Sequence, residues 1–218
     1  MRKLSIVVVV VLAAALFSLA ASAETLVFSD SFEDNTVGKQ PTGWVVNHDL
    51  GGIVVDAAVG KVSDGKLAVE LNNTPDLFGQ IQHAIPETVL GKLMVDFYQP
   101  SALKENINIE VHNASGRIIG VFITGSGNVR PRPAGVQTGD MAKLPNDSWH
   151  TMVITWDDKV FNVYYLENGK LVPILENAEL DPNHIAGGPA NMVLFNLSPR
   201  ADAKKGYIDN VRVYDLSK

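Results

Sequence analysis

Short runs in which apolar and polar residues alternate recur along most of this 218-residue chain, and Gly, Pro, Asn and Asp separate them. Alternation with a period of two indicates strands that bury one face, and no comparable helical periodicity follows the first 23 residues. The pattern predicts twelve strands, at residues 25–29, 44–47, 53–57, 66–71, 79–85, 92–99, 106–112, 117–124, 149–156, 161–167, 192–197 and 207–214.

The residues between these runs indicate tight turns and loops. Asn168-Gly169 is the strongest hairpin signal, because both residues tolerate positive φ. Residues 125–147 hold only scattered apolar positions, which predicts a long irregular segment, either a functional loop or an edge strand. Many short strands at fairly even spacing predict an all-β protein, one antiparallel β-sandwich of the jelly-roll type.

The first 23 residues differ in character from the rest. Met1-Arg2-Lys3 is basic, residues 4–20 are almost wholly apolar, and Ala21-Ser22-Ala23 fits the pattern that signal peptidase recognises. We therefore predict a signal peptide cleaved after Ala23, a secreted protein (extracellular or periplasmic) and a single domain over residues 24–218. The alternative is an uncleaved anchor, since the apolar run approaches the length of a membrane-spanning helix.

Composition limits the partners and the compartment. The formal net charge is −6, and removal of Arg2 and Lys3 would make it −8, which argues against nucleic acid and anionic membranes as partners. The sequence contains no cysteine. An exported protein without disulfides is typical of bacterial secretion, and its stability must come from the core and from a metal where one binds.

Four segments follow one another in a characteristic order: the opening residues 28–44, the Trp-His strand at 147–157, the hairpin at 163–170 and the closing residues 207–211. Together they resemble the concanavalin A-like (laminin G-like) jelly-roll superfamily over nearly the whole mature chain. The resemblance implies two curved antiparallel sheets with a concave face, on which many relatives bind or cleave glycans. Fold alone does not choose between those activities.

Carboxylates stand at both ends of the mature chain, where adjacent first and last strands would bring them together. Clustered carboxylate oxygens suit calcium. Several binding modules of this fold hold calcium between a Phe-Glu opening loop and an Asp of the last strand. The resemblance thus implies one structural calcium held by Glu33 and Asp209, with Asp30 as a third ligand. The alternative is that Asp30 caps a turn and that Asp209 is a solvated strand residue.

Catalytic motifs known in this superfamily are missing from the sequence. Laminarinase-type members need Glu-x-Asp-x-x-Glu on one strand, whereas Glu105 and Glu110 are five residues apart and face opposite sides of a regular strand. The segment Gln80 to His83 resembles one element of alginate lyases, without its companion strands. Glu110 shares a face with Asn108 and His112, as a polar patch or as part of a solvated face. No catalytic residue is assigned, and the sequence favours a protein that is not an enzyme.

Glycan binding would use aromatic faces together with side-chain amides. The candidate carbohydrate-binding residues are Tyr98, Asn108, Trp156, Tyr164 and Tyr207. For each aromatic residue, the alternative is a position in the interior, to which we assign Trp44 and Trp149. Arg130 and Arg132 offer guanidinium groups to acidic sugars, or belong to an exposed loop.

The sequence therefore predicts a secreted, non-catalytic, lectin-like protein that recognises an extracellular polysaccharide. Two alternatives stay open: a divergent polysaccharide hydrolase or lyase of the same fold, and a structural or adhesive cell-surface protein. A binding protein should show aromatics and amides on an open face, and an enzyme should show converging carboxylates or Tyr with His and Arg. An assembly subunit should expose an unpaired apolar edge.

Overall fold

The computed structural model describes residues 24–58, 60–199 and 205–217, and the predicted signal peptide lies outside these ranges. The described residues form strands and two short 3-10 helices, η1 (Pro133–Gly135) and η2 (Ile185–Gly187). None of their helices is long and apolar enough to cross a membrane.

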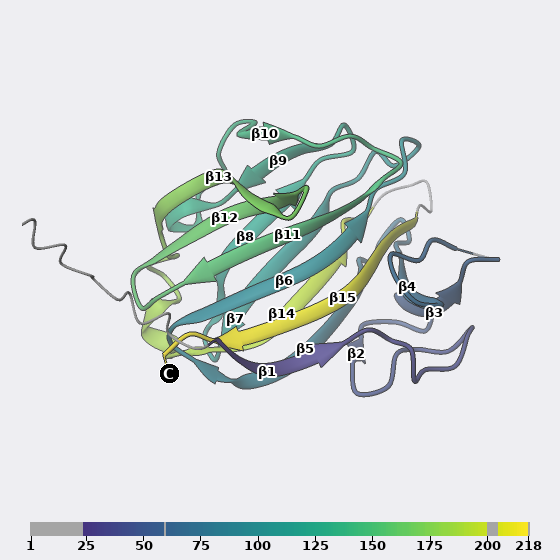
Figure 1. Cartoon of the computed structure of the whole chain (residues 1–218), viewed down its shortest axis with the longest axis horizontal. Coiled ribbons are helices and arrows are strands. Elements are labelled where there is room, and N and C mark those ends of the chain that lie inside the picture. Colours follow the sequence, from purple (N-terminus) through teal and green to yellow (C-terminus); the bar gives the residue numbers. More distant parts are fainter. Residues whose placement is uncertain (1–23, 59, 200–204, 218) are drawn as a thin grey trace, which may run out of the picture.

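The strands form two antiparallel sheets that pack as a sandwich (Figure 1). Sheet A runs in the order β13 (Lys170–Glu179), β12 (Val160–Glu167), β11 (Trp149–Trp156), β6 (Gly91–Tyr98), β15 (Lys205–Asp215), β4 (Leu67–Asn72) and β3 (Gly52–Asp56), with β1 (Thr25–Asp30) paired to β15. Sheet B runs in the order β10 (Ala142–Lys143), β9 (Asn128–Pro131), β8 (Gly116–Ile123), β7 (Ile107–Asn113), β14 (Ala190–Leu197), β5 (Gly79–Thr88) and β2 (Val45–Val46).

The first and last described strands are neighbours, as the sequence predicts. β1 runs antiparallel to β15, with Thr25 opposite Asp215 and Asp30 opposite Val211. Figure 1 shows this pair beside β6 at the front of the molecule. The two ends therefore close one sandwich, and the all-β jelly-roll prediction is confirmed.

Each of the twelve predicted strands is present, β11 with the predicted ends and the others with shifted ends, but three strands were not predicted. The pair β9 and β10 lies inside the segment that we expected to be irregular. β13 contains Pro173 and many polar residues, and it lies at the edge of sheet A, where a missing N–H is tolerated. Strands at an edge need bury little apolar surface, so their sequences show little alternation.

The hairpin between β12 and β13 turns at Asn168-Gly169. Both residues have positive φ, 51° and 75°, as a two-residue turn matching the strand twist requires. This prediction is confirmed, and it explains how a poorly patterned edge strand is placed beside β12.

The core lies between the two sheets and follows the period-two pattern. In β14, Val193, Phe195 and Leu197 are completely buried in the hydrophobic core. In β7, Ile107, Ile109 and Val111 are likewise completely buried in this core. The residues between them must therefore point to the outer face of sheet B, which is where the polar side chains of these two strands gather.

Phe195→Ala should lower the free energy of unfolding by about 3–5 kcal/mol, because it removes a fully buried ring and leaves a cavity. Leu26→Ala is the control, since Leu26 is 50% exposed. This substitution should change the free energy of unfolding by no more than about 0.5 kcal/mol. Urea unfolding followed by tryptophan fluorescence measures both. Equal losses for the two variants would contradict this arrangement of the core.

Candidate functional site

A row of polar and aromatic side chains crosses the outer face of sheet B. Cross-strand pairing sets Gln80 of β5 beside Asn196 of β14, Asn196 beside Asn108 of β7, and Asn108 beside Phe122 of β8. The next row along the same strands includes Glu110, which pairs with Leu194 and with Gly120. Four neighbouring strands thus contribute to one surface.

This surface is hollowed into a pocket of about 430 Å³, which we call the Asn108 pocket. Its lining combines amides, charged groups, apolar side chains and two phenyl rings, from Phe78, Gln80, Asn108, Glu110, His112, Arg117, Phe122, Leu194, Asn196 and Ser198. Phe78, one of these lining residues, has an exposed fraction of 41%. An open hollow with amides and an accessible ring has the composition that a polar ligand with apolar C–H faces requires.

Asn108 is buried at the floor of the pocket with an unused acceptor. Its Nδ2 donates to Asn196 Oδ1 at 2.5 Å and approaches Ser198 Oγ at 3.4 Å. Its Oδ1 has no hydrogen-bond partner among the described residues. A buried polar atom without a partner is costly, so this oxygen is suited to accept a hydrogen bond from a ligand or from water.

Glu110 is the centre of a small charged cluster in the same pocket. Arg117 donates to Glu110 Oε1 and the His112 ring to Glu110 Oε2, each at 2.8 Å. Burial by itself would raise the pKa of Glu110, but the hydrogen bonds and charges of His112 and Arg117 outweigh it and hold that pKa below its ordinary value. Glu110 is therefore an ionised, fixed carboxylate rather than a proton donor.

A second hollow of about 440 Å³ lies where β7 begins and β8 ends. Its lining includes Asn106 and Thr124, which lie two residues beyond Asn108 and Phe122 along the chain, and Arg130 of β9, which is paired with Phe122. The two hollows follow each other along the same strands, as successive units of an extended chain molecule would need.

Four of the five predicted binding residues lie on the opposite sheet, and two of them pack together on its outer face. Tyr98 and Tyr207 are each 7% exposed and pack with Val55 in a small cluster on the outer face of sheet A. Burial and then the nearby Glu70 raise the pKa of Tyr207 well above its ordinary value. These rings offer little face to a sugar, which favours the interior alternative for both.

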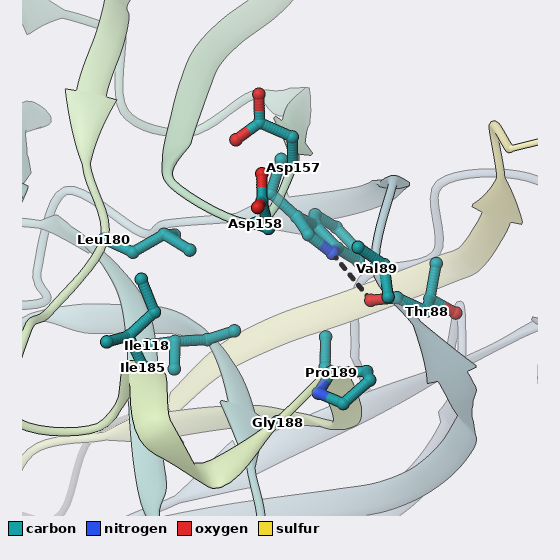
Figure 2. A pocket seen from close by; sticks show the side chains of 11 residues that line it. Thr88, Val89, Ile118, Asp157, Asp158, Leu180, Ile185, Gly188 and Pro189 are labelled. Carbon is teal, nitrogen blue, oxygen red and sulfur yellow. Dashed lines mark hydrogen bonds between the residues drawn. The ribbon is translucent and has the colours of Figure 1, made fainter.

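Trp156 lies in the core, 2% exposed, and its indole N–H donates to the Thr88 carbonyl oxygen at 3.2 Å. It lines a separate apolar pocket of about 230 Å³ at one end of the sandwich. Figure 2 shows Ile118, Leu180 and Ile185 around this pocket, which is too small and too apolar to be the first choice for a sugar.

Three further aromatic residues lie either in the core or on the outer face of sheet A. Tyr164 points outward from sheet A and donates to Glu176 Oε1 at 3.1 Å. Trp44 is in the core as expected. Trp149 is not in the main core: it is half-buried on the outer face of sheet A, with its ring 5.7 Å from that of Tyr98.

The three predicted calcium ligands all accept backbone N–H groups. Asp30 accepts from Phe32 N, and also from the Trp44 indole. Glu33 accepts from Lys66 N and Leu67 N, while Asp209 accepts from Ser63 N, so both carboxylates fix the turn that precedes β4. Within the described ranges no three His, Asp or Glu side chains gather as a metal group. Calcium binding therefore stays a prediction.

Asp209 has an unusual environment for a carboxylate. It is fully buried and lies opposite Asp96 across the β15–β6 pairing. Burial raises the pKa of Asp209 to about 6; the charge of Asp96 adds to this effect, and backbone N–H donors oppose it. Asp96 is itself fixed by hydroxyl donors from Ser63 and Thr151, at 2.7 and 2.6 Å.

The raised pKa of Asp209 predicts a stability contribution that is complete below pH 4 and is lost as the pH rises through 6. It amounts to about 3 kcal/mol, since a pKa that differs by one between the folded and unfolded states corresponds to about 1.4 kcal/mol. Asp209→Asn should remove this part of the pH dependence, whatever its effect on absolute stability. Chemical unfolding at pH 4, 5, 6 and 7 measures the two slopes.

The slopes should be compared in chelator and in millimolar calcium. If calcium binds at Asp209, it favours the ionised carboxylate and should stabilise the protein more at pH 7 than at pH 4. Identical slopes for the original protein and Asp209→Asn would contradict the raised pKa, and identical curves with and without calcium would remove the calcium prediction.

No protein-family model and no curated protein sequence matches this chain. Solved structures that it resembles include a sialidase (16% identity over 90% of this chain, TM-score 0.67) and the laminarinase catalytic domain from Thermotoga maritima (14% identity, 88% of this chain and 98% of that chain, TM-score 0.57). A glycosyl hydrolase family protein from Mycobacterium fortuitum is similar at 15% identity, with 87% and 99% covered and a TM-score of 0.54. The chain spans 19% of the sialidase.

Identities this low show the fold alone, which is the jelly-roll sandwich of these hydrolase domains. Of the predicted binding residues, only Asn108 lines the pocket on sheet B. The sequence pattern also placed Glu110 and His112 on its face, without a role for either. It missed the partners from other segments, including Phe78 just before β5, Phe122 and Asn196, because alternation assigns faces but not which strands are neighbours.

Proposed function

We propose that this protein recognises a polysaccharide in the Asn108 pocket, on the outer face of sheet B. The observation that carries the proposal is the buried Asn108 Oδ1, an acceptor without a partner among the described residues, at the floor of an open polar pocket. Sugar hydroxyls are donors that would satisfy it. The amides of Gln80 and Asn196 beside it offer both donors and acceptors to the same ligand.

Aromatic rings support a sugar rather than a small ion as the ligand. The exposed ring of Phe78 can pack against the C–H face of a pyranose while the amides bond its hydroxyls. The second hollow at Asn106 extends the same surface. An extended glycan with several sugar units in contact therefore fits this face better than a single monosaccharide.

Hydrolysis is the second candidate. Structures similar to this chain carry names of glycoside hydrolases, and this supports the hydrolase alternative more than non-catalytic binding. The Glu110–His112 contact supplies one carboxylate and one titratable ring. The usual mechanism needs two carboxyl groups across the scissile bond, and Glu110 is the one carboxylate among the described residues lining the pocket. We therefore place binding first.

The wider setting of this function remains as the sequence predicts it: a bacterial, secreted member of the concanavalin A-like superfamily, with a structural calcium. These points are proposals, as is the absence of nucleic-acid and membrane partners. An adhesive or structural role is a further alternative. Glycan binding in the Asn108 pocket would favour the binding function over this role.

Asn108→Ala and Phe78→Ala should each weaken glycan binding about fivefold, because one loses a hydrogen bond of about 1 kcal/mol and the other a stacking face of similar value. A glycan array finds the ligand, and isothermal titration calorimetry measures the affinities. Tyr164→Ala is the matched control, since Tyr164 lies on the outer face of sheet A. A loss with Tyr164→Ala and none with the pocket variants would move the site to the other sheet.

Incubation of each bound polysaccharide with the protein tests catalysis. Binding alone predicts no increase in reducing ends and no rise in the ultraviolet absorbance of an unsaturated sugar. If product forms, Glu110→Gln should abolish it while retaining binding, and the hydrolase or lyase alternative would then replace our first choice. Product that persists in Glu110→Gln would place the chemistry outside the Asn108 pocket.

A further inference from the structure

Two arginines, Arg117 of β8 and Arg132 just after the end of β9, converge beside Phe122 at the edge of the Asn108 pocket. The guanidinium carbons of Arg117 and Arg132 lie 5.5 and 5.2 Å from the ring centroid of Phe122. Both stems pass over Gly120, where a Cβ atom would come within 3.1 Å of Arg117 Cδ and 3.3 Å of Arg132 Cδ. The glycine of β8 thus makes room for two cationic side chains over one strand.

The two charges are not balanced to the same extent. Arg117 pairs with Glu110. Arg132 donates through Nε and a terminal nitrogen to the Gly135 carbonyl oxygen, at 3.1 and 2.6 Å, and it forms no ion pair within the part of the chain that the structure describes. Arg132 therefore has no direct ionic partner among the described residues, and its nearest negative charges are those of Glu110 and Asp181.

The electrostatics of Arg132 show the cost of this arrangement. Burial, and then the like charge of Arg117, lowers the pKa of Arg132, against the opposing influence of Glu110 and Asp181. A bound anion would offset both unfavourable effects at once. Two neighbouring arginine side chains stand out in a chain with a formal net charge of −6.

We infer that the Asn108 pocket selects anionic glycans, with a sugar carboxylate or sulfate ester held beside Phe122 by Arg132 and Arg117. The inference rests on the proposed glycan binding and names its ligand class. Arginine presents planar, paired donors that match the oxygens of such groups. The amides of Asn108 and Asn196 then bind the uncharged hydroxyls of the same chain.

Arg130 is only two residues from Arg132 in the sequence, but its surroundings in the structure are different. Arg130 forms an ion pair with Asp140, so its charge is already compensated, and it lines the second hollow. The acidic-sugar role that the sequence offered to Arg130 and Arg132 together therefore passes to Arg132 with Arg117. Arg117 lies near the start of β8, and only the folded structure shows that it lies beside Arg132 and Phe122.

The test titrates the protein with polygalacturonate, with dextran sulfate and with neutral laminarin by calorimetry. At least one anionic polymer should bind about tenfold more tightly than laminarin, the value of one charge-assisted hydrogen bond. Arg132→Gln should remove this preference and leave laminarin binding unchanged. Raising the salt concentration should weaken the anionic ligand alone.

Arg212→Gln is the matched control, because it removes the same charge from β15 in the other sheet and should change no affinity. Arg132→Lys keeps the charge and loses the planar donors, so its preference for anionic polymers should be intermediate. Thermal unfolding checks that each variant is folded.

Equal binding of anionic and neutral polymers, or a preference that survives Arg132→Gln, overturns the inference. Weaker glycan binding in Asn108→Ala with no effect of Arg132→Gln overturns it while supporting glycan binding. No effect of Asn108→Ala on any ligand overturns the proposed function itself.

Discussion

Complete burial of alternate residues in β7 and β14 governs both the packing of the sandwich and the shape of its candidate site. Ile109 and Phe195 are paired across these strands and fully buried between the sheets. A shift of one residue in either strand would turn apolar side chains to solvent and amides into the core, so the register is strongly specified. The same register places Asn108 beside Asn196 on the outer face. The core thus determines the geometry of the candidate site.

Stability and function are therefore separated by face rather than by region. The inner faces of the sheets carry the large buried rings and aliphatic side chains, while the outer face of sheet B carries amides, a fixed carboxylate and two arginines. The outer face of sheet A has a different role. There Asp209 and Asp96 meet beneath the turn preceding β4, and their donors hold that turn and the last strand together.

Much of the fold was predictable, because period-two burial is local and leaves a direct record in the sequence. The errors have physical causes. Edge strands such as β13 bury little and so show little alternation, and Trp149 lies beside a cluster that no single strand reveals. Of the candidate site, Asn108 and the shared face of Glu110 and His112 could be predicted. Large aromatic residues were weak predictors, since Tyr98, Trp156 and Tyr207 stabilise the protein through burial.

The amino-acid order alone defines the all-β class, most strands, the turn at Asn168-Gly169 and which residues share a face, since each follows from neighbours along the chain. Which strands lie side by side is a property of the folded sandwich. Folding set Phe78, Asn108, Phe122 and Asn196 around one pocket and brought Arg132 to Arg117 across Gly120. Contacts between strands far apart in sequence depend on sheet order, and alternation carries no information about that order.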